Sequence, residues 1–162
     1  MRRNNKGVRG TETIQESPAL LRELMRSMYD ELTAIVDYTY GQILWESTLK
    51  MVAELFAATA LTEMRHYLTL GRLLRDLGAP FGLRPTPQGY PTTSLQGECN
   101  PAVAIQMLQE RRRDEEAAAR NYQRLSAMAT DSTAKAVLAT LARDEEEHAA
   151  ALAAMAKRLA GS

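Results

Sequence analysis

Two copies of the pattern Glu-x-x-His are the residues in this sequence best suited to chemistry. They are Glu63-Met64-Arg65-His66 and Glu145-Glu146-Glu147-His148, and they contain both histidines of the chain. Residues three apart lie on one face of an α-helix, so the two side chains of each pair would point the same way. Carboxylate oxygens and imidazole nitrogens are common ligands of divalent transition metals. One such pair is weak evidence, whereas two in similar surroundings indicate a metal site.

Both pairs interrupt apolar stripes that have helical spacing. The first pair is flanked by Phe56 and Leu70, and the second is flanked by Leu141 and Leu152. Such stripes face the core of a bundle. A carboxylate that enters a core without a partner is costly. Divalent cations would remove this cost, because two of them balance four carboxylate charges.

Two further glutamates occupy stripe positions in other segments. Glu31 follows Met28 by three residues, and Glu115 precedes Tyr122 by seven. Together with the two pairs they give six predicted metal ligands: Glu31, Glu63, His66, Glu115, Glu145 and His148. Three neighbouring carboxylates remain open as alternatives to Glu115: Glu110, Asp114 and Glu116.

The two halves of the chain repeat this arrangement. A tyrosine lies seven residues after Glu31, at Tyr38, and another lies seven residues after Glu115, at Tyr122. The alanines three residues after each glutamate also match: Ala34 and Ala118. The repetition predicts two helix pairs related by a pseudo-twofold axis. Tyr38 and Tyr122 are candidate catalytic residues that would donate a hydrogen bond or an electron; the alternative is core packing with a satisfied hydroxyl.

Four helical segments would position these residues. Ser17-Pro18 and Asn100-Pro101 each combine a capping residue with a proline that suits the first helical position. Gly41 and Ser47 place the first turn nearby, and Asp131 is a suitable cap for the last helix. We therefore expect helices over residues 18 to about 44, about 52 to 77, 101 to about 129, and from about 132 onward.

The connection over residues 78–100 holds most of the prolines and several glycines. A connection of this length can join parallel helices of a bundle, whereas short loops join antiparallel neighbours. The predicted fold is all-α, an antiparallel four-helix bundle of two helix pairs joined by a long crossover. We expect residues 17–162 to form this domain, and residues 1–16 to be a flexible basic tail.

Composition limits the other classes of function. Twenty basic and twenty acidic residues cancel, which gives no electrostatic case for binding nucleic acid or an anionic membrane. No apolar run is long enough to predict a membrane span. Cys99 is the only cysteine, which excludes a disulfide or a cysteine-based zinc or rubredoxin-type iron site within one chain. A lone cysteine suits a reducing compartment, so we expect a cytoplasmic protein.

Residues 17–160 resemble the ferritin-like superfamily, especially its bacterioferritin and rubrerythrin branches. The resemblance is carried by Glu31-Leu32-Thr33-Ala34-Ile35, by Glu54-Leu55-Phe56 and by the two Glu-x-x-His segments. That superfamily builds a two-metal site from one glutamate on each of two helices and Glu-x-x-His on each of the other two. The resemblance implies that Glu63 and Glu145 bridge two metals.

By the same resemblance, Glu31 and His66 would complete one metal, and Glu115 and His148 the other. Asp144, which precedes the second motif, could orient His66, but its counterpart before the first motif is Thr62. Rubrerythrins add a carboxylate one turn from the third-helix glutamate. The corresponding positions here hold Arg111, Arg112, Ala118 and Ala119.

The predicted function is that of an oxidoreductase that binds two Fe(II) ions and reacts with dioxygen or hydrogen peroxide. Two alternatives remain open. A similar ligand set serves two manganese ions in catalases that disproportionate peroxide, and the protein could instead sequester or deliver iron without catalysis. We also expect a homo-oligomer, at least a dimer, with no nucleic-acid or membrane partner.

Overall fold

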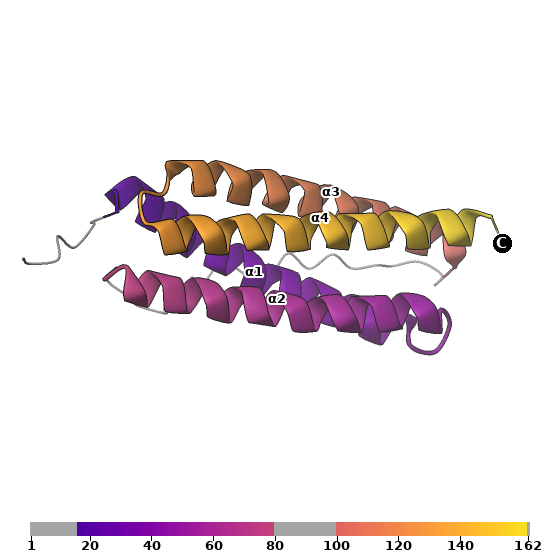
Figure 1. Ribbon diagram of the computed structural model, residues 1–162. Helices are drawn as coiled ribbons and strands as arrows, with labels where there is room; N and C mark the ends of the chain where they lie inside the picture. The colour runs from indigo at the N-terminus through magenta and orange to yellow at the C-terminus, as the bar shows by residue number, and fades with distance from the viewer. Residues whose placement is uncertain (1–15, 80–99, 162) are drawn as a thin grey trace, which may run out of the picture.

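The computed structural model describes residues 16–79 and 100–161, which form an all-α bundle. The crossover at 80–99 and the tail at 1–15 lie outside the described residues. The predicted fold class of two helix pairs is confirmed (Figure 1). The helices are α1 (Pro18–Trp45), α2 (Lys50–Asp76), α3 (Pro101–Met128) and α4 (Ser132–Ala160).

Side-chain caps begin three of the helices as the sequence predicts. Ser17, Asn100 and Asp131 each accept a hydrogen bond from the backbone N–H three residues on, at 3.1, 3.1 and 2.8 Å. Pro18 and Pro101 then occupy the first helical positions, where a missing N–H costs nothing. These caps fix where the long helices start, and therefore where along the bundle each candidate ligand lies.

The end of α2 uses a glycine in a conformation that other residues rarely adopt. Gly78 has a φ of 70°, in the left-handed region, and the N–H of Ala79 donates to the carbonyl of Leu74 at 3.0 Å. This is the pattern in which a left-handed residue after the last turn satisfies the final carbonyls.

The glycine in α1 has a packing role in addition to lying near the predicted turn. Ser47 lies in the turn between α1 and α2, but Gly41 lies inside α1, four residues before its end. A Cβ atom at position 41 would clash with the ring of Phe56 on α2. Gly41 is therefore a close-approach position between two helices, and the turn that was predicted to lie near Gly41 and Ser47 directly follows α1.

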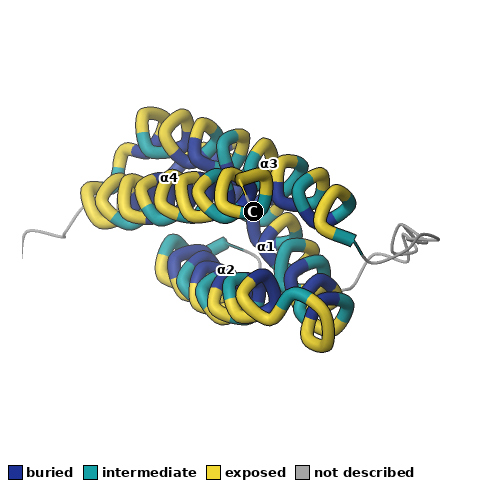
Figure 2. Tube along the Cα trace, turned by 90° about the vertical axis from the view of Figure 1, so that its right-hand side faces the viewer, coloured by how far each residue is buried: buried dark blue, intermediate teal, exposed yellow. Residues whose placement is uncertain are grey.

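The helices pack as α1 with α2 and α3 with α4 (Figure 1). The two pairs meet along α1–α3 and α2–α4, where the backbones approach each other at fewer places. In Figure 2 the buried residues of each helix lie on the sides that face the other helices. The interior between the two pairs is consequently filled by long side chains.

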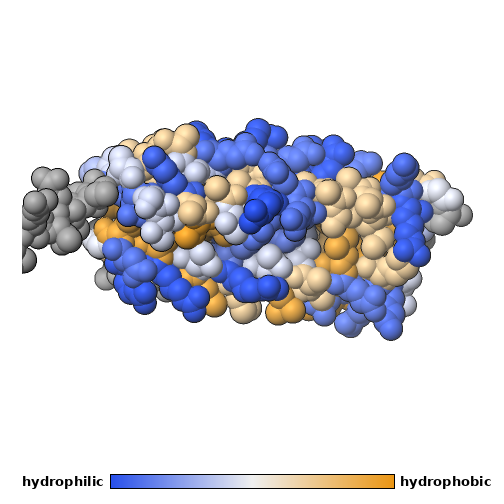
Figure 3. Space-filling view, viewed as in Figure 1, coloured by the Kyte–Doolittle hydropathy of each residue, from blue (hydrophilic) through white to orange (hydrophobic). Residues whose placement is uncertain are grey.

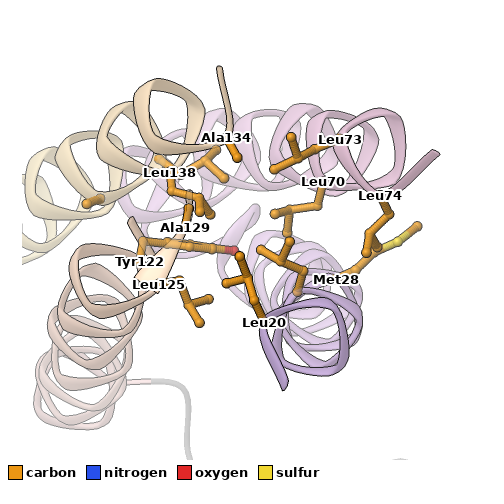
Figure 4. Packing of buried hydrophobic residues seen from close by; sticks show 13 residues of the cluster. Leu20, Met28, Leu70, Leu73, Leu74, Tyr122, Leu125, Ala129, Ala134 and Leu138 are labelled. Atoms are coloured by element: carbon orange, nitrogen blue, oxygen red, sulfur yellow. The ribbon is translucent and has the colours of Figure 1, made fainter. Parts of the chain in front are cut away.

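Two apolar clusters lie on either side of the predicted ligands along the bundle. One includes Leu24, Leu70 and Leu138, and Figure 4 shows Tyr122 reaching into it from α3. The other includes Trp45 and Phe56 near the α1–α2 turn. The buried glutamates and histidines form a polar layer between these clusters, which keep water away from both ends of that layer.

One face of the bundle is covered by a mixture of polar and apolar side chains. Hydrophilic side chains cover much of the face seen in Figure 3, with apolar side chains between them. None of the helices in the described ranges has a stretch that is both long and apolar enough to cross a bilayer.

Candidate metal centre

The six predicted ligands converge in the middle of the bundle. Their ligand atoms form two groups, and within each group all the atoms lie within 4.8 Å of one another. Glu63 and Glu145 belong to both groups. The first group adds Glu31 and His66, and the second adds Glu115 and His148. All four helices therefore contribute, and the two glutamates of the Glu-x-x-His motifs lie at the centre.

His66 faces three of the carboxylates through one nitrogen. Its Nδ1 lies 3.0 Å from Glu63 Oε2 and 3.0 Å from Glu145 Oε1. Glu31 Oε2 is farther from the same nitrogen, at 3.7 Å.

His148 repeats this arrangement in the other half. Its Nδ1 lies 2.9 Å from Glu63 Oε1 and 3.0 Å from Glu145 Oε2. Glu115 Oε2 lies 3.9 Å away. The ring centroids of the two histidines are 5.7 Å apart, so the centre has the pseudo-twofold symmetry that the sequence repeat predicts.

The tyrosines connect the two halves. The hydroxyl of Tyr38 donates a hydrogen bond to Glu115 Oε1, and the hydroxyl of Tyr122 donates one to Glu31 Oε1. Each bond runs between α1 and α3. Both tyrosines are buried, and burial raises the pKa of each hydroxyl well above its ordinary value. They therefore remain hydrogen-bond donors at neutral pH.

The histidines are protonated in the metal-free protein. Burial alone would lower their pKa, but close contacts with the surrounding carboxylates outweigh it. Those with Glu145, Glu31 and Glu63 raise the pKa of His66 to about 12. Those with Glu115, Glu145 and Glu63 raise the pKa of His148 to about 11.

The four carboxylates divide into two kinds. Burial raises the pKa of Glu31 to about 8 and that of Glu115 to about 7. Burial acts on Glu63 and Glu145 too, but close contacts with the two histidines outweigh it and lower the pKa of both. The metal-free core thus balances two imidazolium ions against the two shared carboxylates, while the outer two retain protons up to near neutral pH.

Two buried oxygens indicate that this network is incomplete without a cation. Glu63 Oε1 and Glu145 Oε1 have no hydrogen-bond partner, although each lies about 3 Å from a histidine Nδ1. Each Nδ1 has one hydrogen, which it directs to the glutamate of its own helix. An oxygen left unpaired in a core is costly. Divalent ions bound by these oxygens and nitrogens would satisfy them, so the donor set fits a metal centre.

A cavity of about 500 Å³ opens between α1 and α3 and reaches the carboxylates. Glu31, Glu63, Glu115 and Glu145 line its inner part, together with both tyrosine side chains. Ala34 and Ala118 form part of its walls. The matched alanines of the sequence repeat were the available signal for this cavity, but the cavity itself was not predicted.

The structure also places the neighbouring carboxylates of α3. Glu115 is buried within the ligand cluster, whereas the side chain of Asp114 is largely exposed and that of Glu116 is partly exposed. Glu116 pairs with Arg112, and Glu110 accepts a hydrogen bond from Gln106. Among the carboxylates of α3, only Glu115 belongs to the cluster in the described part of the chain.

A family model described as rubrerythrin matches residues 23–156. The chain belongs to the rubrerythrin family. This family is part of the ferritin-like superfamily of di-iron carboxylate proteins, and rubrerythrin-type domains bind iron. The resemblance noted in the sequence is thereby confirmed. No curated protein matches the chain.

The positions at which this rubrerythrin-family chain departs from the expected pattern have identifiable roles. Arg111 pairs with Asp37 of α1 and, at 2.9 Å, with Asp114 of its own helix. Ala118 lines the cavity beside Glu115. An ion pair between α1 and α3 and an open space therefore occupy the region around Glu115. Sequence spacing alone gave no signal for the pairing of Arg111 with Asp37, which are 74 residues apart.

Proposed function

We propose that this protein is a di-iron oxidoreductase that binds two Fe(II) ions and reacts with dioxygen or hydrogen peroxide. The observation that carries the proposal is the pair of overlapping four-residue groups that share Glu63 and Glu145. Two Fe(II) ions together supply two electrons, enough to reduce peroxide to water or dioxygen to peroxide.

The proposed ligands divide into shared and terminal residues. Glu63 and Glu145 would each contact both ions, because each belongs to both groups. Glu31 with His66, and Glu115 with His148, would each serve one ion. Hard carboxylate oxygens supplemented by imidazole nitrogens suit iron.

The remaining residues position and protect the centre. Tyr122 and Tyr38 hold the terminal carboxylates of Glu31 and Glu115 through hydrogen bonds. The apolar clusters on either side keep water from the two ends of the ligand layer. The cavity between α1 and α3 supplies a path for a small oxidant, because it ends at the carboxylates and the tyrosine hydroxyls.

Metal stoichiometry tests the ligand assignment. Elemental analysis after anaerobic loading with Fe(II) should give two ions per chain. Glu63→Ala with Glu145→Ala should lose both ions, and His66→Ala or His148→Ala should mainly affect one. Glu54→Ala, which removes an exposed carboxylate from α2, should bind two. Full loading of the Glu63→Ala, Glu145→Ala variant contradicts the assignment.

Stopped-flow absorbance tests the reaction. The Fe(II)-loaded protein should oxidise rapidly when mixed with peroxide or air, consuming two irons per chain in the first phase. Glu31→Ala and Glu115→Ala should slow that phase without unfolding the bundle. The Glu63→Ala, His148→Ala variant provides the background rate, and a wild-type rate no higher than this background contradicts the proposal.

Manganese is the second candidate, because the same oxygen-rich donor set suits it. The manganese-loaded protein would then disproportionate peroxide over many turnovers. Elemental analysis of protein purified from its own host, together with peroxide turnover by both loaded forms, separates the two functions.

A further inference from the structure

The two halves of the candidate centre match at the shared glutamates but differ behind the histidines. The Nδ1 atoms of His66 and His148 have equivalent distances to Glu63 and Glu145. On the far side of the ring, His66 Nε2 lies 3.4 Å from Asp144 Oδ2. Within residues 16–79 and 100–161, no carboxylate forms the equivalent pair with Nε2 of His148.

This difference has a direct cause in the sequence. Asp144 immediately precedes Glu145 on α4, and the residue that precedes Glu63 on α2 is Thr62. The Thr62 hydroxyl donates instead to the carbonyl of Ala58, at 3.3 Å, within its own helix. The pseudo-twofold relationship therefore places a carboxylate behind one histidine and a neutral hydroxyl at the corresponding position in the other half.

A carboxylate behind a ligating histidine changes how well that histidine binds a metal. It accepts a hydrogen bond from Nε2, which fixes the orientation of the ring and leaves Nδ1 available to the metal. It also increases the basicity of the ligand. His66 is in addition the more buried of the two, with 3% of its side chain exposed against 13% for His148.

We propose that the two metal positions are unequal, and that Asp144 is a positioning residue that makes the His66 position fill first. This inference rests on the proposed two-metal function. Loss of an outer carboxylate of this kind weakens metal binding by about 10- to 100-fold. The 3.4 Å distance is long for a charge-assisted bond, and the Asp144 side chain is 34% exposed. We therefore expect the lower end of this range, a loss of about tenfold in metal affinity.

A second difference between the halves involves two residue pairs, neither of which carries a net charge. Arg111 pairs with Asp37 in one half, and Asn121 donates to Ser27 at 3.0 Å at the corresponding place in the other. An ion pair carries no net charge, and a hydrogen-bonded amide and hydroxyl carry none either. Neither pair is therefore expected to separate the two metal affinities as Asp144 does.

The experiment must locate the first ion, because two cations that share carboxylates repel and bind in two steps even at identical positions. Crystals of the full chain with one equivalent of Co(II) would be examined by anomalous diffraction. In the wild type, Co(II) occupancy beside His66 should exceed that beside His148 by about tenfold. Glu147→Gln removes an exposed carboxylate from the same helix and should leave this ratio unchanged.

Exchange of the two outer residues provides the decisive variants. Asp144→Thr places threonine behind both histidines, and Thr62→Asp places aspartate behind both, so each should bring the occupancies close to equal. The double variant Thr62→Asp, Asp144→Thr should move the first Co(II) to His148. Calorimetric titration should show a weaker first step in Asp144→Thr and a tighter second step in Thr62→Asp.

The outcomes separate this inference from the proposed function. Two bound Co(II) ions with equal first occupancy in the wild type, or a ratio unaffected by Asp144→Thr, overturn the inference and leave the two-metal centre intact. Absence of Co(II) binding overturns both. If the double variant fails to fold, as judged by circular dichroism, the Asp144→Thr ratio alone decides.

Discussion

The hydroxyl of Tyr38 on α1 donates a hydrogen bond to the carboxylate of Glu115 on α3. Tyr122 on α3 returns an equivalent bond to Glu31 on α1. The two helix pairs have few backbone approaches along this side, so these bonds connect the pairs directly at the candidate centre. They also hold the two carboxylates that are proposed to serve one metal each.

Removal of either hydroxyl should destabilise the metal-free protein. Tyr38→Phe and Tyr122→Phe should each lower the free energy of unfolding by about 1.5 kcal/mol, because each leaves a buried carboxyl group without its donor. The pseudo-twofold symmetry predicts similar losses in the two variants. Urea denaturation measures them, with an unchanged slope showing that the transition remains two-state. Tyr40→Phe, at a residue that is 44% exposed, should have little effect, and equal losses in all three variants would contradict the role of the two bonds.

Much of the fold follows from the sequence because its signals are local. The caps at Ser17, Asn100 and Asp131 depend on residues only three positions away, and all three form as predicted. The convergence of Glu31 and Glu115 with the two motifs also follows, because a carboxylate inside an apolar stripe must face the same core.

The remaining features depend on contacts between distant segments. Gly41 predicted a nearby turn because glycine often marks turns, and the turn does follow α1, but the ring of Phe56 on the neighbouring helix is what requires a glycine at this position. Spacing placed Tyr38 on the core face of its helix but could not identify Glu115 as its partner. The partner depends on how the two pairs are rotated about their axes, and no spacing within one helix specifies that rotation.

The stability of the metal-free protein should decrease as the pH rises above about 4.5, and more steeply above about 6.5. The pKa values of His66 and His148 are raised to about 12 and about 11 from 6.5, so the native state binds protons that the unfolded state lacks in that window. Glu31 and Glu115, with pKa values raised from 4.5 to about 8 and about 7, act in the same direction above pH 4.5. The slope should be on the order of 1 kcal/mol per pH unit for each proton.

At acidic pH the dependence of stability on pH reverses, so stability decreases as the pH falls. The pKa of Glu63 is lowered from 4.5 to about 2, so its contribution is lost as the pH falls through that range. Urea denaturation of the metal-free protein at a series of pH values should therefore give a maximum near pH 4.5, where the contribution of Glu63 is reached and the losses from Glu31 and Glu115 begin. Stability that increases steadily from pH 6.5 to 9 would contradict the protonated histidine pair.

Metal binding should release protons from the same cluster. At pH 7 the metal-free centre holds protons on both histidines, on Glu31 and partly on Glu115. Two divalent ions should displace about three of them. Calorimetric titrations in buffers of different ionisation enthalpy measure this number. The rise in melting temperature caused by metal should consequently increase from pH 5 to pH 8, and release of less than one proton would contradict displacement from these residues.

Gly41→Ala should destabilise the protein although alanine is the better helix former. Its Cβ would clash with the ring of Phe56, which is fully buried and packs against Tyr38 with ring centroids 5.5 Å apart. Overpacking costs about 1–3 kcal/mol, whereas the gain in helix propensity is at most about 1 kcal/mol. In a double-mutant cycle with Phe56→Leu, the smaller side chain should relieve much of the loss. Additive effects would show that Phe56 is not the obstacle.

Ala118→Leu should narrow the cavity that leads to the candidate centre. Ala118 lines the cavity between α1 and α3 beside Glu115 and Tyr122, so a leucine there would fill space without replacing a proposed ligand. Iron stoichiometry should remain at two ions per chain. Oxidation of the Fe(II)-loaded protein by cumene hydroperoxide should slow by about tenfold or more, and oxidation by hydrogen peroxide should slow less, because a pocket discriminates by size.

Two matched variants complete this test. Ala34→Leu, on the opposite wall of the cavity, should have a similar effect because it is the pseudo-twofold counterpart. Ala127→Leu adds the same bulk at an exposed position of α3 and should change neither rate. Equal slowing of the two oxidants by Ala118→Leu would mean that the leucine disturbs the ligands rather than access. Unchanged rates for both oxidants would mean that they reach the centre by another route, such as the α2–α4 side, where a second cavity of about 330 Å³ lies against His66 and Asp144.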